Sequence, residues 1–254
     1  MMKKYSKARI FNLKVTCLVV IFAMVSSVSL HAQLFTEWTG TGNWSNGGNW
    51  NNGYGYGQLE YKGGGSTTSN NDLSPAAQWR LFFNGGTSYT LTGSQVNLSD
   101  FGGAESWVLS ESTVDQTLNF NIEFVDGNFQ PAWITTKNSG NLIFNGSVSV
   151  AGNVNQLQLA NTSANGRIII NGVLSGDEAI FIGRDESFTA QSFTSVEFTS
   201  ANTYTSDTLI DGGSLTVSGS GDLGSNADVF VSANTILFVN NNLTVETVRE
   251  RGSS

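Results

Sequence analysis

The feature of this sequence that most constrains its fold is a strand-and-turn unit that recurs at a nearly regular spacing. The segment NLIFNGSVSV aligns with RIIINGVLSG, so that Phe144-Asn145-Gly146 and Ile170-Asn171-Gly172 coincide at a step of 26 residues. Phe198 follows Ile170 by 28 residues, and Phe120 precedes Phe144 by 24. A period in the twenties is typical of solenoids, in which each coil buries its inward side chains against the neighbouring coils.

Within these units, apolar side chains occupy every second position, as they do in strands with one buried face. The alternating sets are Trp79-Leu81-Phe83, Leu118-Phe120-Ile122-Phe124, Leu142-Phe144 and Ile168-Ile170. Glycine is abundant at 29 residues and proline is nearly absent at 2, which indicates many tight turns between short strands. We therefore predict an all-β fold, a right-handed parallel β-helix whose repeats cover residues 75–254.

The repeated Asn-Gly pairs are predicted to lie at the corners of the coils. Both residue types tolerate the left-handed backbone conformation that a sharp corner can demand. Asparagines stacked at equivalent corners can also form hydrogen bonds from one coil to the next. The alternative is an antiparallel sandwich with Asn-Gly hairpins, which local patterns leave open but the repeat spacing disfavours.

Residues 33–74 are rich in tryptophan, glycine and asparagine and are predicted to form an N-terminal cap and a linker. Trp38, Trp44 and Trp50 follow one another at intervals of six residues. Because the end of a parallel stack exposes backbone groups and apolar side chains, we expect these aromatics to cover the first coil. The competing hypothesis is a carbohydrate-binding platform of indole rings. The segment from Lys62 to Ser74 is expected to be a polar linker or a protruding loop.

The first 32 residues differ from the rest and are predicted to be a signal peptide. Five lysines and arginines precede or border an apolar run from Val15 to Leu30, which is shorter than a typical membrane-spanning helix. We predict cleavage between Ala32 and Gln33, a secreted or outer-surface location and no membrane span after cleavage. An uncleaved membrane anchor is the alternative.

Cleavage at this position would remove Cys17 and His31, the only cysteine and the only histidine. Disulfides, thiol catalysis and zinc held by nitrogen or sulfur ligands are thereby excluded from the mature chain. Seven lysines and arginines would remain against twenty acidic residues, a formal net charge of −13. Such a surface repels nucleic acid, so we expect no nucleic-acid partner, and we predict no metal site and no cofactor.

Carboxylates that could serve a glycan-cleaving enzyme occur at Asp177-Glu178, Asp185-Glu186, Asp207 and Asp211. Each lies in a polar turn, where acids are normally solvated, and nothing in the sequence sets the separation that a catalytic pair needs. Arg167 and Arg184 could assist an acidic polysaccharide, but both are isolated in an acidic chain. We therefore predict no catalytic residue and leave the ligand-binding residues unidentified, with Ca²⁺ at the same acids as an open alternative.

The segment TSANTYTSDTLIDGGSLTVSGSGDLGS, residues 199–225, resembles the autotransporter-associated β-strand repeat of bacterial surface passenger proteins. The matching positions are Asn202, Thr203, Tyr204, Thr208, Ile210, Gly213, Leu215 and Val217. Ser200 and the pair Ser206-Asp207 stand where the family usually has glycine. The Trp38 to Trp50 segment is similar to the tryptophan-rich opening of proteins that carry such repeats. The resemblance implies a surface-exposed β-helical stalk and supplies no catalytic residues.

Together these features predict a structural or adhesin-like surface protein, with cell-surface or extracellular glycans or proteins as partners. The alternative is a β-helix that binds or cleaves polysaccharide. Near the C-terminus, Thr235–Val239 and Leu243–Val245 continue the strand pattern without a visible cap. We expect that the chain is either a fragment of a longer passenger or a protein that associates end to end through this coil. In the second case, Phe238 contributes to the contact. The charged residues Glu246, Arg249, Glu250 and Arg251 would oppose that association.

Overall fold

The computed structural model describes residues 35–54, 57–78, 80–99, 106–126, 130–152, 154–184, 189–224, 228–240, 243 and 247–251. Thr36–Ser254 forms one compact unit. The predicted signal peptide, with Cys17, His31 and the proposed cleavage site, lies outside the described residues, as does Trp79. Apart from the 3-10 turn η1 (Gly47–Asn49), every helix or strand element in the described residues is a β-strand.

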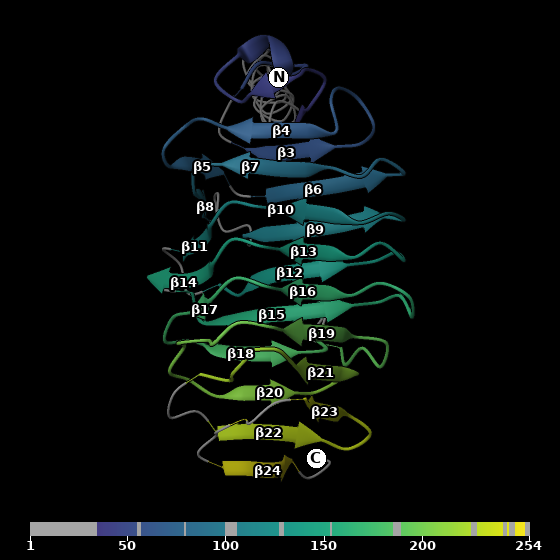
Figure 1. Cartoon of the computed structure of the whole chain (residues 1–254), viewed down its shortest axis with the longest axis vertical. Helices are drawn as coiled ribbons and strands as arrows, with labels where there is room; N and C mark the ends of the chain where they lie inside the picture. The colour runs from purple at the N-terminus through teal and green to yellow at the C-terminus, as the bar shows by residue number, and fades with distance from the viewer. Residues whose placement is uncertain are drawn as a thin grey trace, which may run out of the picture. The chain divides into compact units, whose positions relative to one another are not determined.

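The strands form three parallel sheets (Figure 1). The ten-stranded sheet consists, in order, of β1 (Phe35–Glu37), β3 (Gln58–Tyr61), β6 (Arg80–Gly85), β9 (Trp107–Ser112), β12 (Ala132–Thr136), β15 (Gln156–Asn161), β18 (Ala179–Ile182), β20 (Thr208–Ile210), β22 (Asp228–Ser232) and β24 (Thr247–Arg251). The nine-stranded sheet consists of β2 (Gly42–Asn43), β4 (Thr68–Asn71), β7 (Thr90–Gly93), β10 (Gln116–Leu118), β13 (Leu142–Phe144), β16 (Ile168–Ile170), β19 (Ser195–Phe198), β21 (Ser214–Val217) and β23 (Ile236–Val239). The five-stranded sheet consists of β5 (Ala76–Gln78), β8 (Val96–Leu98), β11 (Ile122–Asp126), β14 (Val148–Gly152) and β17 (Leu174–Ser175).

Consecutive strands belong to different sheets, so the chain winds in coils and each strand pairs with its counterpart in the next coil (Figure 1). Side chains that point inward form columns along the stack, such as Leu142, Ile168 and Val196. These columns are buried and form one continuous hydrophobic core. The prediction of an all-β parallel β-helix is confirmed.

The register confirms most of the repeat alignment. Phe144 pairs with Ile170 and Ile170 pairs with Phe198, at the expected steps of 26 and 28 residues. The alignment of Phe120 with Phe144 is wrong, because Leu118 is the residue that pairs with Phe144. Phe120 lies beyond the end of β10 and packs edge-on against Trp44, with ring centroids 5.9 Å apart.

Asparagines at successive corners form the expected hydrogen-bonded column. Asn145 Nδ2 donates to Asn119 Oδ1 at 2.7 Å, and Asn171 Nδ2 donates to Asn145 Oδ1 at 2.8 Å. The Thr199 hydroxyl continues the column by donating to Asn171 Oδ1 at 2.9 Å. Because each bond joins two coils, the column fixes the corners relative to one another.

The glycines that follow two of these asparagines have a different role from the predicted one. Neither Gly146 nor Gly172 has a left-handed φ. Instead, a Cβ added at Gly172 would lie 2.0 Å from the carbonyl oxygen of Gly146 in the coil before it. Glycine is needed here because the two backbones approach too closely for any side chain.

The solenoid extends through the segment that was expected to be a linker. Strand β4 lies within residues 62–74 and pairs with β2 on one side and β7 on the other. Ser69 and Asn71 of this strand are buried, and Asn71 Nδ2 donates to the carbonyl oxygens of Ser94 and Gln95 at 2.8 and 3.1 Å. This segment is therefore an integral coil.

The segment that resembles the autotransporter-associated repeat forms the coil of β20 and β21. Tyr204 is fully buried, and its hydroxyl lies 2.6 Å from the Thr208 hydroxyl. Burial raises the pKa of Tyr204 above its ordinary value. Asn202 Oδ1 accepts a hydrogen bond of 2.8 Å from the amide of Leu174 in an earlier coil. These matching residues thus pack and bond the coil to its neighbours.

Candidate functional site

The N-terminal tryptophans do not present their rings to solvent. Trp38, Trp44 and Trp50 are buried and pack edge to face, with centroid separations of 5.0 Å for Trp38 and Trp50 and 5.8 Å for Trp44 and Trp50. Their indole N–H groups donate to the Ser66 carbonyl at 3.0 Å, to the Ser69 hydroxyl at 2.6 Å and to the Trp44 carbonyl at 3.1 Å, respectively. The hypothesis of a carbohydrate platform at these residues is wrong, because no ring face is open to a sugar.

The same segment covers the free edge of the first strand of the ten-stranded sheet. Trp38 and Trp50 form an antiparallel β-bridge. The Glu37 amide donates to Asn51 Oδ1 at 2.9 Å, and the Asn51 amide donates back to the Glu37 carbonyl at 3.0 Å. Backbone groups that would otherwise face water at this end are therefore bonded, as expected of a cap.

The candidate carboxylates are dispersed over different turns. Asp177 is exposed. The pKa of Glu178 is raised, mainly because the carboxyl is partly buried and to a smaller extent because the Asp177 charge lies nearby. Asp207 accepts a hydrogen bond of 3.2 Å from the Asp228 amide. Asp185 and Glu186 lie outside the described residues. No group of three or more His, Cys, Asp or Glu residues in the described ranges is placed to hold a metal ion.

Asp211 differs from the solvated turn acid that was expected. Its side chain is nearly buried and lies between two arginines, 2.6 Å from Arg184 and 2.8 Å from Arg251. The Ser232 hydroxyl donates a further hydrogen bond to Asp211 at 2.8 Å. Arg167, the other arginine considered for an acidic substrate, lies 2.7 Å from Glu197. Arg167 and Arg184, the two arginines considered for an acidic substrate, are thus both engaged in ion pairs.

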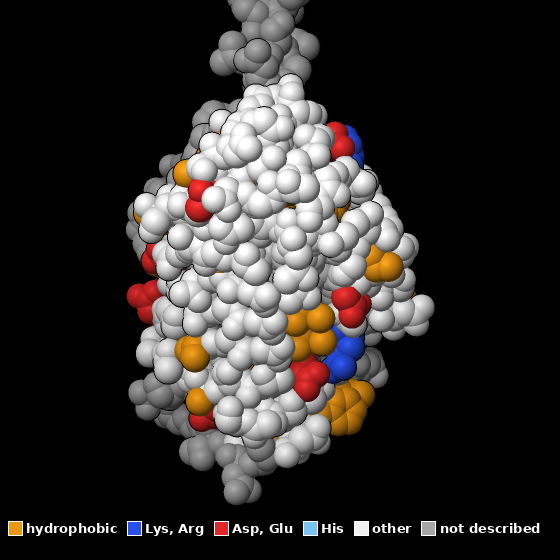
Figure 2. Space-filling model, turned by 45° about the horizontal axis from the view of Figure 1, so that its top comes forward, with side chains coloured by type: hydrophobic (Ala, Val, Ile, Leu, Met, Phe, Trp, Pro, Cys, Tyr) orange, Lys and Arg blue, Asp and Glu red, His pale blue; other side chains and the backbone are white. Residues whose placement is uncertain are grey.

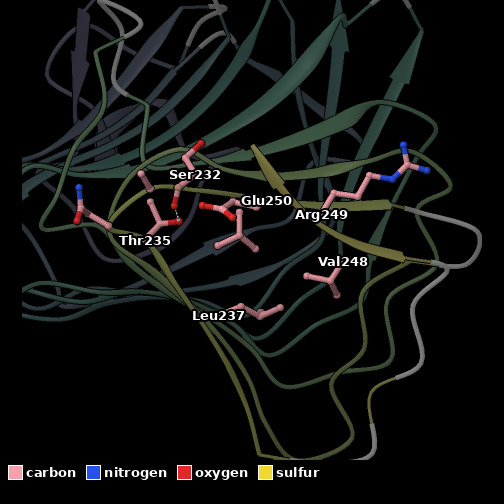
Figure 3. Close-up of a pocket in the computed structure, with 9 residues that line it drawn as sticks. Ser232, Thr235, Leu237, Val248, Arg249 and Glu250 are labelled. Atoms are coloured by element: carbon pink, nitrogen blue, oxygen red, sulfur yellow. Dashed lines mark hydrogen bonds between the residues drawn. The ribbon is translucent and has the colours of Figure 1, made fainter. Parts of the chain in front are cut away.

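A hollow of about 510 Å³ lies at the other end of the described solenoid, between β22, β23 and β24 (Figure 3). Its apolar lining includes Val231, Leu237 and Val248, and Glu250 lies at the same site. Val248 continues the inward column of Val229, and Glu250 continues that of Val231. The hollow is therefore the uncovered interior of the last described coils.

Exposed apolar side chains are concentrated at this end. Of the five large apolar side chains that are exposed in the described residues, four belong to β23 and β24: Ile236, Phe238, Val239 and Val248. Strand β24 ends the ten-stranded sheet and β23 ends the nine-stranded sheet, so each has an unpaired edge within the described residues. Phe238 pairs with Thr216 on the outer surface, so Leu237 and Val239 are in the inward register, and Phe238 does not line the hollow.

Two tryptophans that the sequence reasoning did not consider lie on the outer side of the ten-stranded sheet. Trp107 and Trp133 are paired in register in adjacent coils, and Gln158 follows Trp133 in the next one. The available signal was their separation of 26 residues, the same as the repeat step. The sequence could not show which face of the sheet each tryptophan occupies, because each directly precedes another apolar residue, Val108 or Ile134, so the alternation is not visible.

Comparisons with protein-family models, curated proteins and solved structures found no match to this chain. Within the described ranges, no helix has the length and apolar character required to cross a membrane.

Proposed function

We propose that this chain is a structural, adhesin-like β-solenoid of a secreted or surface-exposed protein, and that it acts as a rigid spacer without catalysis. The observation that supports this most directly is the asymmetry of the stack, which has a bonded cap at its first coil and exposed apolar side chains at its last described coils. The resemblance of residues 199–225 to the autotransporter-associated repeat agrees with this role. The face in Figure 2 shows mainly backbone and uncharged polar side chains, with few charged and apolar side chains, several of which lie together toward the lower right.

Export is the first testable part of this proposal. We expect the exported protein to begin at Gln33, because a basic start, an apolar run and Ala32 precede this residue. Intact-mass and N-terminal peptide analysis of the extracellular protein measures this directly. An extracellular form that begins at Met1 would contradict the prediction.

The second part concerns the C-terminal coils, which we propose bind a second copy of the chain. An unpaired parallel edge above an apolar hollow is a template for further strands. The cap already bonds the edge of β1, the first strand of the ten-stranded sheet, so we expect two copies to meet through β23 and β24 at the other end. When two identical ends meet, the contact has a twofold axis and occupies the same surface on both copies. Association through this surface therefore stops at a dimer.

Charged residues at this end moderate the contact. Arg249 and Arg251 point outward and pair with Asp228 at 3.0 Å and with Asp211 at 2.8 Å. Like charges brought together in a symmetric contact would repel one another, and these ion pairs reduce that repulsion. Glu250 points toward the hollow, and Glu246 lies outside the described residues.

Val248→Asp is expected to convert the dimer to a monomer without loss of the fold, because Val248 is 57% exposed and lines the hollow. Light scattering over a concentration series measures the association, and circular dichroism measures the fold. Phe193→Asp is the matched control, since Phe193 is 56% exposed but lies before β19, away from the hollow. A wild-type protein that stays monomeric at high concentration, or that forms assemblies larger than a dimer, would contradict the proposal.

A further inference from the structure

One acidic side chain lies in an inward column at the C-terminal end of the described solenoid. Glu250 of β24 pairs in register with Val231, and Val231 continues the column of Ile182 and Ile210. This column is apolar in every coil from Leu59 onward. An inward carboxylate in the last described coil therefore stands where the earlier coils have an apolar side chain.

The Glu250 carboxylate is solvated while the hollow is open. Glu250 lies at the hollow beside Val231, Leu237 and Val248 (Figure 3). Within the described residues, its carboxylate has no hydrogen-bond or ion-pair partner. The residue is exposed in the single chain, so water supplies the hydrogen bonds that this carboxylate needs. Any partner that closes the hollow removes this water.

The charged groups near Glu250 lie on the other side of the sheet. Arg249 and Arg251 flank Glu250 on β24 but point outward, where they pair with Asp228 and Asp211 at 3.0 and 2.8 Å. Strand β23 and the turn between β22 and β23 contain no titratable side chain. In the described coils, no cation therefore faces the Glu250 carboxylate.

The symmetry of the dimer places two Glu250 side chains in one interior. Both sheets can continue from one copy into the other when the twofold axis runs from the ten-stranded sheet to the nine-stranded sheet. Such an axis keeps the inward face of β24 inward in both copies. The side chains of Glu250 and Val248 then enter the shared interior, while the arginines stay outside. Two ionised carboxylates in one apolar interior lack water and repel each other.

We propose that association of the C-terminal coils is coupled to proton uptake by Glu250, so that the dimer is stronger in acidic surroundings than at neutral pH. This inference rests on the proposed contact through β23 and β24. A buried carboxyl that has taken up a proton is far less costly than a buried, unpaired carboxylate. The dimer therefore binds more protons than two separate monomers do. Because the associated state takes up protons, its dissociation constant falls as the pH falls.

Sedimentation equilibrium of the exported protein at neutral and at mildly acidic pH measures this coupling. We expect the dissociation constant of the wild-type dimer to be about tenfold lower at about pH 5.5 than at about pH 7.5. Glu250→Gln removes the titrating group and keeps the shape of the side chain. This variant is expected to dimerise about tenfold more tightly than wild type at the higher pH and to respond little to pH. Circular dichroism verifies that its fold is retained.

Glu123→Gln is the matched control. Glu123 is a partly exposed carboxylate of β11, in the five-stranded sheet, and it does not line the hollow. The substitution changes the net charge by the same amount as Glu250→Gln. We expect it to keep the pH response of the wild type, which separates the effect of Glu250 from that of total charge.

The possible failures are distinguishable. A wild-type dimer with the same dissociation constant at both pH values would overturn the proton coupling and leave the C-terminal contact intact. A pH response that persists in Glu250→Gln would do the same. A wild-type protein that stays monomeric at both pH values and at high concentration would overturn the proposed contact, and the coupling with it.

Discussion

Ile170→Lys is expected to unfold the solenoid or to lower its free energy of unfolding by about 4 kcal/mol or more. Ile170 is fully buried and pairs with Phe144 in one neighbouring coil and Phe198 in the other. Lysine at this position would place an ammonium group in the core without a partner, at a cost of several kcal/mol. Typical domains have a total stability of only about 5 to 15 kcal/mol. Urea denaturation followed by circular dichroism measures the change.

Ile169→Lys provides the matched control. Ile169 is the adjacent residue of β16, but it points outward and pairs with Glu197 in the next coil. Lysine is compatible with this half-buried surface and with the nearby carboxylate, so we expect a change within about 0.5 kcal/mol. Equal denaturation midpoints for the two variants would show that the register of β16 is wrong.

Gly172→Ala is expected to cost about 3 kcal/mol or more, because close packing prevents the structure from accepting even one methyl group. The new Cβ would lie 2.0 Å from the Gly146 carbonyl oxygen and 2.3 Å from its carbonyl carbon, far inside van der Waals contact. These are backbone atoms, so no side-chain rotation can relieve the clash. The two coils would have to separate at this corner. Thermal denaturation of the purified variant measures the loss.

The control is Gly86→Ala, in which the same methyl group is added at a position with no atom within 4 Å. Gly86 also lacks a left-handed φ, so alanine is compatible with the backbone. Such a change commonly stabilises a protein by about 0.4 to 1 kcal/mol, because it restricts the unfolded chain. If Gly172→Ala were as stable as Gly86→Ala, the close approach of the coils at Gly172 would be disproved.

The sequence predicted the fold because the repeat and the alternation agree in the central coils. Ile170 is inward on both criteria, and the structure places it there. Alternation alone could not distinguish Leu118 from Phe120 as the partner of Phe144, since both follow the same period of two. The aromatic match suggested Phe120, whereas the hydrogen-bonded register selects Leu118.

Two further errors have physical causes. Asn-Gly is common both where φ is positive and where two backbones nearly touch. The sequence alone could therefore not show that the close approach of two backbones, and not a positive φ, requires glycine at Gly172. Phe238 lies in the segment Ile236–Val239, in which every residue is apolar, so no alternation marked Leu237 and Val239 as the inward residues. The same ambiguity concealed the outward direction of Trp107 and Trp133.

The stacking of coils also determines how this protein responds to force. Inter-coil hydrogen bonds, such as the one that the Asn171 amide donates to the Phe144 carbonyl, join one coil only to its neighbours, so a pull along the stack can detach coils one at a time. The C-terminal coils lack a cap in the described residues and would peel first. A repeat of 26 residues releases roughly 90 Å of extended chain, given about 3.4 Å per residue. A solenoid built in this way lengthens stepwise under tension, and the coils that remain keep their structure.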